Sequence, residues 1–214
     1  MYRIVFLLLS SLSLLGCKEQ VSSTVGLPYY NEPTFTPVFI KDTGEVTQKI
    51  THTISNFEFL NQDSVLVNQS FIENKIHVAN FIFTSCGSIC PTMTNHMKQV
   101  ADSLKTDERV VFLSYSVTPW LDTPSVLKNY QEREGVTNKN WQFLTGSKGD
   151  IYKLARQSYF AEEDLGFSKD STEFLHTEHF ILVDKTKRIR GIYNGTLALE
   201  MNALLEDIRT LQAE

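Results

Sequence analysis

Two cysteines separated by three residues form the part of the sequence best suited to chemistry. Cys86 and Cys90 are followed at once by Pro91, in the stretch FTSCGSICP, whose other residues are mostly small or polar. This composition favours a turn over a core segment. Because four positions span about one helical turn, both sulfurs can project to the same side. The pair could close a disulfide or bind a soft metal ion together, and the alternative is two buried structural cysteines.

The segments on either side must position these cysteines. Residues 78–83 form an apolar run rich in β-branched and aromatic side chains, which predicts a buried strand. Met93, Met97, Val100 and Leu104 are spaced four, three and four apart, as on the apolar stripe of a helix. The cysteines are therefore expected at a strand-to-helix turn, where backbone N–H groups and the helix dipole favour thiolates. A thiolate is both a nucleophile and a metal ligand.

The rest of the chain alternates between strand and helix patterns. Further strands are predicted at 54–67 (a hairpin), 110–117, 141–144 and 180–193 (a second hairpin). Three further helices are predicted: one from Pro124 with Thr123 as its N-cap, one over 151–158 and one over 197–211. This order predicts an α/β fold with a mixed central sheet flanked by helices and with an N-terminal extension. A thiol turn after the first long strand makes it thioredoxin-like.

The N-terminus carries a targeting pattern. Arg3 is followed by an apolar run that is too short to span a membrane and ends Leu14-Leu15-Gly16-Cys17. Leu-Leu-Gly-Cys resembles the lipobox of bacterial lipoproteins. The resemblance implies a signal peptide over 1–16, an acylated Cys17, and a membrane-anchored domain outside the cytoplasm, on the periplasmic side. The alternative is an ordinary signal peptide with a chance cysteine.

The remaining boundaries follow from composition. Residues 17–50 are expected to form a tether and an irregular lead-in, because their prolines rule out regular helix. Residues 51–214 are then the domain, long enough for a full hydrophobic core. The formal net charge of −5 argues against nucleic acid as a partner.

A histidine stands where the predicted fold usually has a proline. Thioredoxins place a cis-proline opposite the thiols, just before the strand that enters the closing hairpin, whereas residues 174–179 of this chain are FLHTEH. The fold would then bring an imidazole to the two sulfurs. Two thiolates and one imidazole make a soft three-coordinate site that suits Cu(I) and also accommodates Cu(II), whereas zinc normally takes a fourth ligand.

These motifs together resemble the Sco/SenC family, thioredoxin-fold proteins that are anchored to membranes, bind copper and assist assembly of the dinuclear copper centre of cytochrome c oxidase. The family's Cys-x-x-x-Cys-Pro after a Phe-rich strand is matched by FIFTSCGSICP, from residue 81. Its Ser-Val-Asp-Pro-x-x-Asp-Thr-Pro-x-x-Leu-x-x-Tyr is matched by SVTPWLDTPSVLKNY, from residue 116. Its metal histidine, followed by Ser or Thr and six residues before a Leu, corresponds to His176. The similarity covers roughly residues 50–211.

The resemblance implies a site and partners. Copper would be held by Cys86, Cys90 and His176, and the partner would be the copper-bearing subunit of cytochrome c oxidase. Because disulfides persist outside the cytoplasm unless something reduces them, the cysteine pair also needs a metal or a reductant to stay open, and a thioredoxin-like reductant is the further partner expected. One departure is Thr118, which stands where the family has Asp near the site. Tuning of the site or partner docking is therefore expected to differ.

Several other side chains compete for a role. His179 is the rival of His176, but strand alternation with Phe180 and Leu182 inward turns His179 outward. Met93 could ligate copper, yet its place on the helix stripe predicts a core residue. The remaining polar candidates are assigned structural positions: His96 as a solvated helix residue, His52 and His77 before strands and unconnected to the turn, and Asp122 and Asp150 at helix starts.

Two functions of different classes remain open. The first is a copper-binding metallochaperone, which is not a true enzyme. The alternative is a thiol–disulfide reductase in which Cys86 attacks and Cys90 resolves, keeping target cysteines reduced for metallation. A peroxidase is less well supported, because no Arg or Thr stands at the spacing that would activate a peroxidatic cysteine. The histidine discriminates between the first two, since metal binding needs it and exchange does not.

Overall fold

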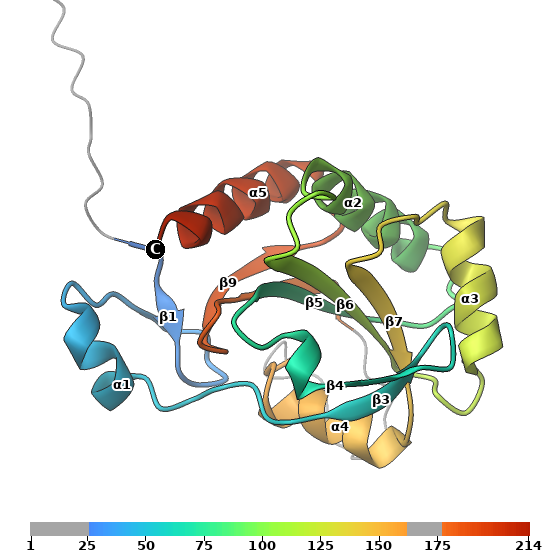
Figure 1. Ribbon diagram of the computed structural model, residues 1–214, viewed down its shortest axis with the longest axis horizontal. Coiled ribbons are helices and arrows are strands. Elements are labelled where there is room, and N and C mark those ends of the chain that lie inside the picture. The colour runs from blue at the N-terminus through green and yellow to red at the C-terminus, as the bar shows by residue number, and fades with distance from the viewer. Residues whose placement is uncertain (1–25, 162–176) are drawn as a thin grey trace, which may run out of the picture.

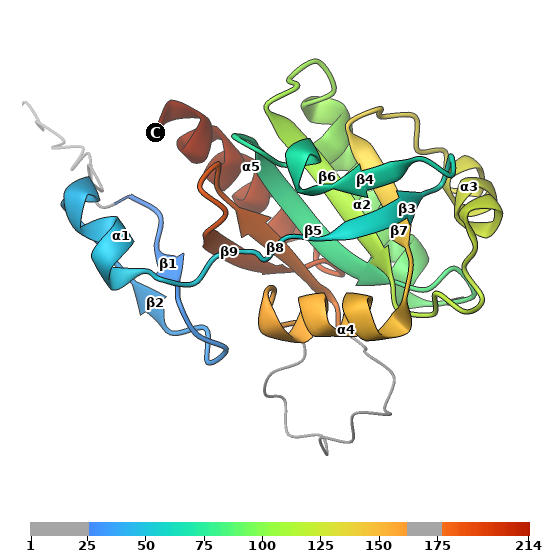
Figure 2. The same cartoon turned by 60° about the horizontal axis from the view of Figure 1, so that its bottom comes forward.

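A mixed nine-stranded sheet organises the computed structural model, which describes residues 26–161 and 177–214. The strand order is β2-β1-β9-β8-β5-β6-β7-β3-β4. Helices α2 and α5 cover one face and α4 covers the other, with α3 beside α2 at one end (Figures 1 and 2). The predicted α/β architecture with a mixed central sheet is confirmed.

The strands are β1 (Tyr29–Tyr30), β2 (Pro37–Val38), β3 (Glu58–Asn61), β4 (Leu66–Asn68), β5 (Ile76–Ile82), β6 (Val110–Ser116), β7 (Trp141–Thr145), β8 (His179–Val183) and β9 (Ile189–Asn194). The α-helices are α1 (Val46–Lys49), α2 (Ile89–Ser103), α3 (Pro124–Arg133), α4 (Lys148–Gln157) and α5 (Ala198–Ala213). Two 3₁₀ turns, Thr43–Glu45 and Gln69–Phe71, complete the described elements. The predicted start of α3 is confirmed: Pro124 is its first residue, and the Val126 N–H donates to the Thr123 hydroxyl at 3.4 Å.

The centre of the sheet is buried on both faces. β5 and β6 pair in parallel from Ile76↔Val110 to Ile82↔Ser116, and every residue of both strands is buried. Alternate side chains enter two separate cores. Val78 and Ile82 pack with the stripe of α2, whereas Ala79 and Phe81 pack with α4. A near-continuous apolar strand is what a sheet covered on both faces requires.

The lead-in before residue 51 is more ordered than predicted. β1 pairs antiparallel with β9 at Tyr30↔Ile189 and with β2, so residues 29–38 extend the sheet. A single helical turn, α1, follows the prolines. The prediction of an irregular lead-in is therefore wrong for β1, β2 and residues 43–49. Pairing with β9, about 160 positions away, supplies the order of the two strands.

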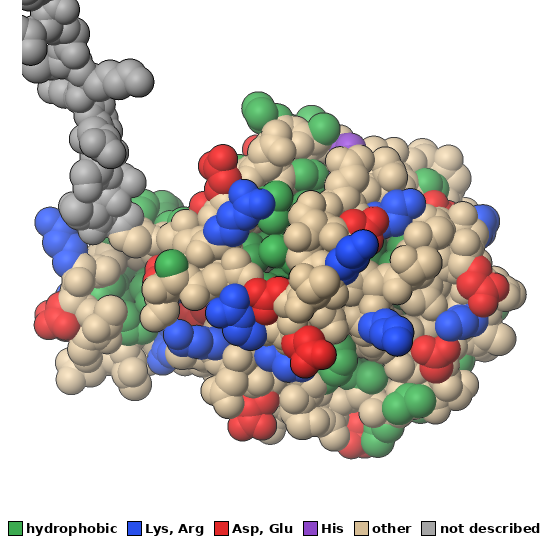
Figure 3. Space-filling model, turned by 45° about the horizontal axis from the view of Figure 1, so that its top comes forward, with side chains coloured by type: hydrophobic (Ala, Val, Ile, Leu, Met, Phe, Trp, Pro, Cys, Tyr) green, Lys and Arg blue, Asp and Glu red, His purple; other side chains and the backbone are tan. Residues whose placement is uncertain are grey.

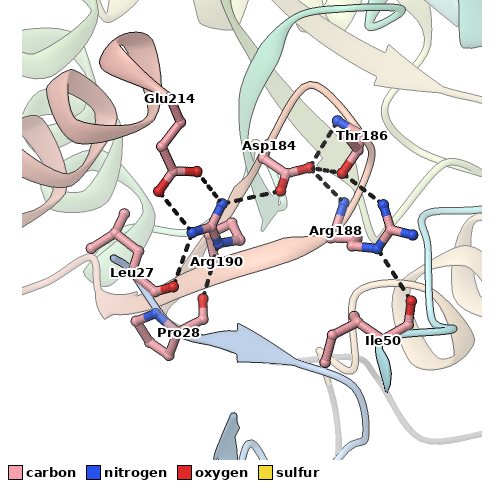
Figure 4. Close-up of polar contacts among 8 residues, drawn as sticks. All are labelled: Leu27, Pro28, Ile50, Asp184, Thr186, Arg188, Arg190 and Glu214. Atoms are coloured by element: carbon pink, nitrogen blue, oxygen red, sulfur yellow. Dashed lines mark hydrogen bonds and ion pairs between the residues drawn. The ribbon is translucent and has the colours of Figure 1, made fainter. Parts of the chain in front are cut away.

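A buried arginine holds this lead-in to the rest of the fold (Figure 4). Arg190 is 2% exposed and donates hydrogen bonds to the carbonyls of Leu27 and Pro28, at 2.9 and 3.1 Å. It also pairs with Asp184 at 3.2 Å and with Glu214 at 2.7 Å. We call Arg190, Asp184 and Glu214 with the two carbonyls the arginine clasp. It joins the N-terminal segment, the β8–β9 hairpin and the last residue of the chain.

The arginine clasp and the cysteine turn lie at opposite ends of the sheet. β8 is antiparallel to both β5 and β9, so β9 runs in the direction of β5. The start of β9 therefore lies at the same end of the sheet as the start of β5, whereas the cysteines follow the end of β5. None of the helices in the described part of the chain combines the length and apolar character needed to cross a bilayer. The predicted signal peptide and Cys17 lie outside the described residues.

Candidate metal and thiol site

The two cysteines lie where β5 gives way to α2. β5 ends at Ile82 and α2 begins at Ile89, so Cys86 lies in the turn and Cys90 in the first helical turn. Both are free thiols, 7% and 2% exposed. The predicted strand-to-helix turn is confirmed, and the apolar stripe of α2, including fully buried Met93, packs into the core as expected.

The turn makes the two thiols unequal. Burial acts to raise the pKa of Cys86, but hydrogen bonds from the backbone N–H groups and side chains of Cys90 and Ser88 outweigh it and lower that pKa to about 7. The Ser88 hydroxyl lies 3.8 Å from the Cys86 sulfur. Burial raises the pKa of Cys90 to about 12, and the nearby Cys86 and the Asp122 carboxylate act in the same direction. Near neutral pH, Cys86 therefore supplies a thiolate while Cys90 keeps its proton.

A buried carboxylate lies behind the turn. Asp122 is 1% exposed and accepts four hydrogen bonds, all from neutral groups. Thr84 donates twice, from its hydroxyl at 2.6 Å and its backbone N–H at 3.3 Å. The hydroxyls of Ser116 and Thr118 donate at 2.6 and 2.9 Å. We call these four residues the aspartate network.

The interpretation of Asp122 as a helix-start residue is confirmed, but it was incomplete. It precedes the N-cap of α3, but its carboxylate points to the ends of β5 and β6. The sequence held a signal for this network: Thr84 and Ser116 stand at the carboxyl ends of two predicted strands. The structure shows that these strands, β5 and β6, are parallel neighbours. The hydroxyls of the two residues meet at one edge of the sheet and need an acceptor.

The third predicted ligand is a histidine. His176 lies outside the described residues, so its role as a ligand stays a prediction. Within residues 26–161 and 177–214, no group of three His, Cys, Asp or Glu side chains is arranged to hold a metal ion. His179 is the first residue of β8; it is half-buried, and its Nδ1 lies 3.1 Å from the Thr177 hydroxyl.

The sequence profile of the SCO1/SenC family matches residues 45–213. The chain belongs to the SCO1/SenC family. A curated relative, the SCO1 protein homolog of Bacillus subtilis, is 30% identical over 168 residues, which cover 78% of this chain and 86% of the relative. The resemblance inferred from the cysteine and histidine motifs is therefore confirmed.

Solved structures of SCO1/SenC proteins share the fold. A SCO1/SenC family lipoprotein from Bacillus anthracis is similar with a TM-score of 0.66 and 30% identity, over 76% of this chain and 96% of that one. BsSco, described as a member of the Sco family of cytochrome c oxidase assembly proteins with a disulfide switch, gives 0.64 and 29%, over 76% and 94%. These similarities confirm the predicted thioredoxin-like fold.

A more distant solved structure shares the fold as well. ScoI of Bradyrhizobium japonicum, determined with copper bound, is similar with a TM-score of 0.59 and 23% identity, over 74% of this chain and 99% of that one.

One side chain distinguishes this SCO1/SenC member from the family pattern given above. Thr118 replaces the pattern's Asp, is 5% exposed and donates to Asp122 at 2.9 Å. Its own backbone N–H donates to the Ser116 hydroxyl at 3.1 Å. An Asp at 118 would place a second carboxylate against Asp122, whereas Thr supplies a neutral donor.

The other histidines of this SCO1/SenC chain have structural partners away from the cysteines. His96 was expected to be solvated, but it is half-buried and its Nδ1 lies 2.8 Å from the carbonyl of Gly195, so that expectation is wrong. His77 lies within β5 rather than before it; burial lowers its pKa to about 3, and its Nε2 lies 3.1 Å from the Tyr159 hydroxyl. His52 lies 2.8 Å from the Ser158 carbonyl.

Proposed function

We propose that this protein is a copper-binding metallochaperone that assists assembly of the dinuclear copper centre of cytochrome c oxidase. Copper, its cargo, would be held by Cys86, Cys90 and His176. The observation that carries the proposal is the pair of free thiols at the end of β5, one of which has a pKa of about 7. At neutral pH Cys86 supplies a thiolate with little competition from protons, whereas Cys90 must release its proton as it binds the metal.

The chemistry of the donors favours copper over harder ions. Thiolates select soft metal ions, Cu(I) above all, and an imidazole suits copper in either oxidation state. The relatives support the same choice: ScoI binds copper, and BsSco belongs to a family described as assembling cytochrome c oxidase. The copper-bearing subunit of that oxidase is then the partner that receives the ion.

The proposal includes attachment to a membrane. Cys17 would carry the lipid and become the first residue of the mature protein, with the domain on the periplasmic side. The relative from Bacillus anthracis is itself described as a lipoprotein. The face drawn in Figure 3 intersperses Lys and Arg with Asp and Glu side chains. That mixture suits a protein partner better than nucleic acid, which requires a basic stripe.

A metal titration tests the proposal. The full-length chain with Cys17→Ser, kept reduced in detergent, is titrated with Cu(I) against a chromophoric chelator, next to the same chain with Cys86→Ser and Cys90→Ser. We expect one tightly bound Cu(I) in the first and a loss of at least a hundredfold in affinity in the second. Equal affinity in the two chains would refute the site.

One observation also favours the second function, a thiol–disulfide reductase. The unequal pKa values, about 7 and about 12, suit an attacking Cys86 and a resolving Cys90. Cys86 would attack a target disulfide and form a mixed disulfide, and Cys90 would then release the target as a dithiol. The Cys86–Cys90 disulfide would be reduced again by a thioredoxin-like dithiol. Wild-type exchange rates in a chain that does not bind Cu(I) would favour this function.

A further inference from the structure

We propose that Asp122 is a positioning residue that fixes the cysteine turn for the proposed copper site. This rests on the proposed function. Through Asp122, the aspartate network joins the segment before the cysteine turn to the end of β6 and to the start of the connection that leads to α3. Thr84, two residues before Cys86, is held by both its backbone N–H and its hydroxyl, while Ser116 ends β6 and Thr118 begins the turn towards α3.

A second set of contacts fixes the same residue, Thr84, through its carbonyl. Arg133, the last residue of α3, donates to the carbonyl of Thr84 at 3.2 Å. Its guanidinium lies 4.9 Å from the ring centre of Tyr130, whose hydroxyl bonds Thr94 of α2 at 2.7 Å. Thr84 is therefore tied to β6 and α3, and through Tyr130 to the helix that carries Cys90.

These ties determine how the two thiols face each other. Cys90 is fixed by the helix that contains it, but Cys86 lies in a six-residue connection between β5 and α2. The position of Cys86 depends on where that connection leaves the sheet, which Asp122 sets. Binding by two preorganised sulfur ligands avoids the cost of ordering the turn on ligation, so loosening the turn weakens binding.

Two substitutions at Asp122 separate positioning from charge. Asp122→Ala removes the acceptor of all four bonds. Asp122→Asn removes the charge but keeps one oxygen, which can still accept from Ser116, Thr118 and the Thr84 N–H; the Thr84 hydroxyl can rotate to accept from the new amide. If Asp122 acts by position, Asn should rescue what Ala loses.

Asp184 provides a matched control. It is 6% exposed and also accepts four hydrogen bonds: from the Thr186 N–H and hydroxyl, the Arg188 N–H and the Arg190 guanidinium. It lies in the arginine clasp, at the far end of the sheet. Asp184→Ala therefore destabilises a comparable buried network without touching the cysteine turn.

The experiment measures two properties of the full-length Cys17→Ser chain and its variants. The first is Cu(I) affinity. The second is the equilibrium with glutathione, in which Cys86 and Cys90 are oxidised to a disulfide while one glutathione disulfide is reduced to two glutathione thiols. We expect Asp122→Ala to lower Cu(I) affinity at least tenfold and to change the exchange constant by about tenfold, which is about 30 mV. We expect Asp122→Asn to stay within about threefold of the parent chain and Asp184→Ala within about twofold.

Three results would overturn the proposal: no change in Asp122→Ala, an equal change in Asp184→Ala, or an Asn variant as impaired as the Ala variant. If the parent chain fails to bind Cu(I) while its exchange constant still responds to Asp122→Ala alone, the proposed function fails and the positioning role stands. If Asp122→Ala does not fold, Thr84→Val is compared with Thr186→Val, since each removes one hydroxyl that donates to an aspartate at 2.6 Å. A shift in both properties confined to Thr84→Val supports the proposal, and equal behaviour overturns it.

Discussion

The aspartate network and the arginine clasp lie at opposite ends of one sheet, and each surrounds a buried aspartate with different donors. Asp122 and Asp184 each accept four hydrogen bonds in the interior. Asp184 meets the guanidinium of Arg190, which is itself almost fully buried (Figure 4). The donors to Asp122 are all hydroxyl and amide groups.

This difference distinguishes the arginine clasp, a structural network, from the aspartate network, which lies beside the cysteine turn. In the arginine clasp, opposite charges compensate each other and join three distant segments, so its main effect is on stability. Behind the cysteine turn, a carboxylate that accepts only from neutral donors joins the segment before Cys86 to the end of β6.

Breaking the arginine clasp should give the largest effect on stability. Arg190→Met leaves Asp184 buried without its cation and two carbonyls without their donor. We expect the free energy of unfolding to fall by about 3–5 kcal/mol, as when one partner is removed from a buried pair. Denaturant unfolding of the full-length chain measures it, and the exchange constant of the cysteine pair should stay within about twofold.

An exposed ion pair provides the control for that variant. Lys128 and Asp63 lie 2.9 Å apart with side chains 41% and 48% exposed. Lys128→Met should therefore cost no more than about 1 kcal/mol. Equal losses in the two variants would show that burial does not distinguish the arginine clasp.

The second largest effect concerns the cysteine end. His176→Ala should lower Cu(I) affinity by about a hundredfold, because a three-coordinate site loses one ligand and removing even an outer partner costs 10–100-fold. The Cu(I) affinity of the chain that retains His176 should also fall as pH drops through about 6.5, since only neutral imidazole binds the metal. A competition titration with both thiols reduced measures this.

His179→Ala is the matched variant for the ligand assignment. His179 begins β8 and lies against Thr177, so we expect its substitution to change affinity less than threefold. A large loss in His179→Ala alone would mean that the register of the two histidines is wrong. Near wild-type affinity in both variants would leave only the dithiol and favour the reductase.

A third prediction concerns the inequality of the two thiols. Because the pKa of Cys86 is lowered to about 7, its alkylation by iodoacetamide should reach a plateau above pH 8 and be about tenfold slower at pH 6. Cys90, with its pKa raised to about 12, should stay unreactive across this range. Mass spectrometry of the separate peptides measures both rates. Matching profiles with midpoints near pH 8.5 would contradict the inequality.

The patterns around the cysteine turn predicted its structure because they depend on local periodicity. The apolar run of β5, the four-three-four spacing on α2 and the Thr123-Pro124 start of α3 are each determined within one element. The lead-in was misjudged for the opposite reason. β1 and β2 have two residues each and depend on pairing with β9 and on Arg190, which no local pattern reveals.

The site was predictable only in part for the same reason. The cysteines are identified by their spacing, but the burial of Asp122 requires β5 and β6 to be parallel neighbours, so that Thr84 and Ser116 meet. His96 was misassigned because its partner, the Gly195 carbonyl, lies 99 positions away. Pairings of this kind follow from topology, which a single sequence pattern does not determine.

The smallest expected effect tests whether the neutral surroundings of Asp122 matter. Thr118→Asp replaces a donor with a second acid at a position 5% exposed, in contact with Asp122. Two adjacent buried carboxylates cannot both ionise easily, so the pKa of one of them should rise above its unfolded value. A group with a raised pKa stabilises the fold fully below its unfolded pKa and loses that contribution as pH rises through its folded pKa. The variant should therefore match the wild type near pH 4 and be less stable by about 1 kcal/mol at pH 7. Thr118→Val, which removes the hydroxyl without adding an acid, should show a deficit of similar size that does not change with pH. Unfolding curves for both variants from pH 4 to 8 measure the difference. A deficit in Thr118→Asp that is independent of pH would show that the second carboxylate turns away from Asp122.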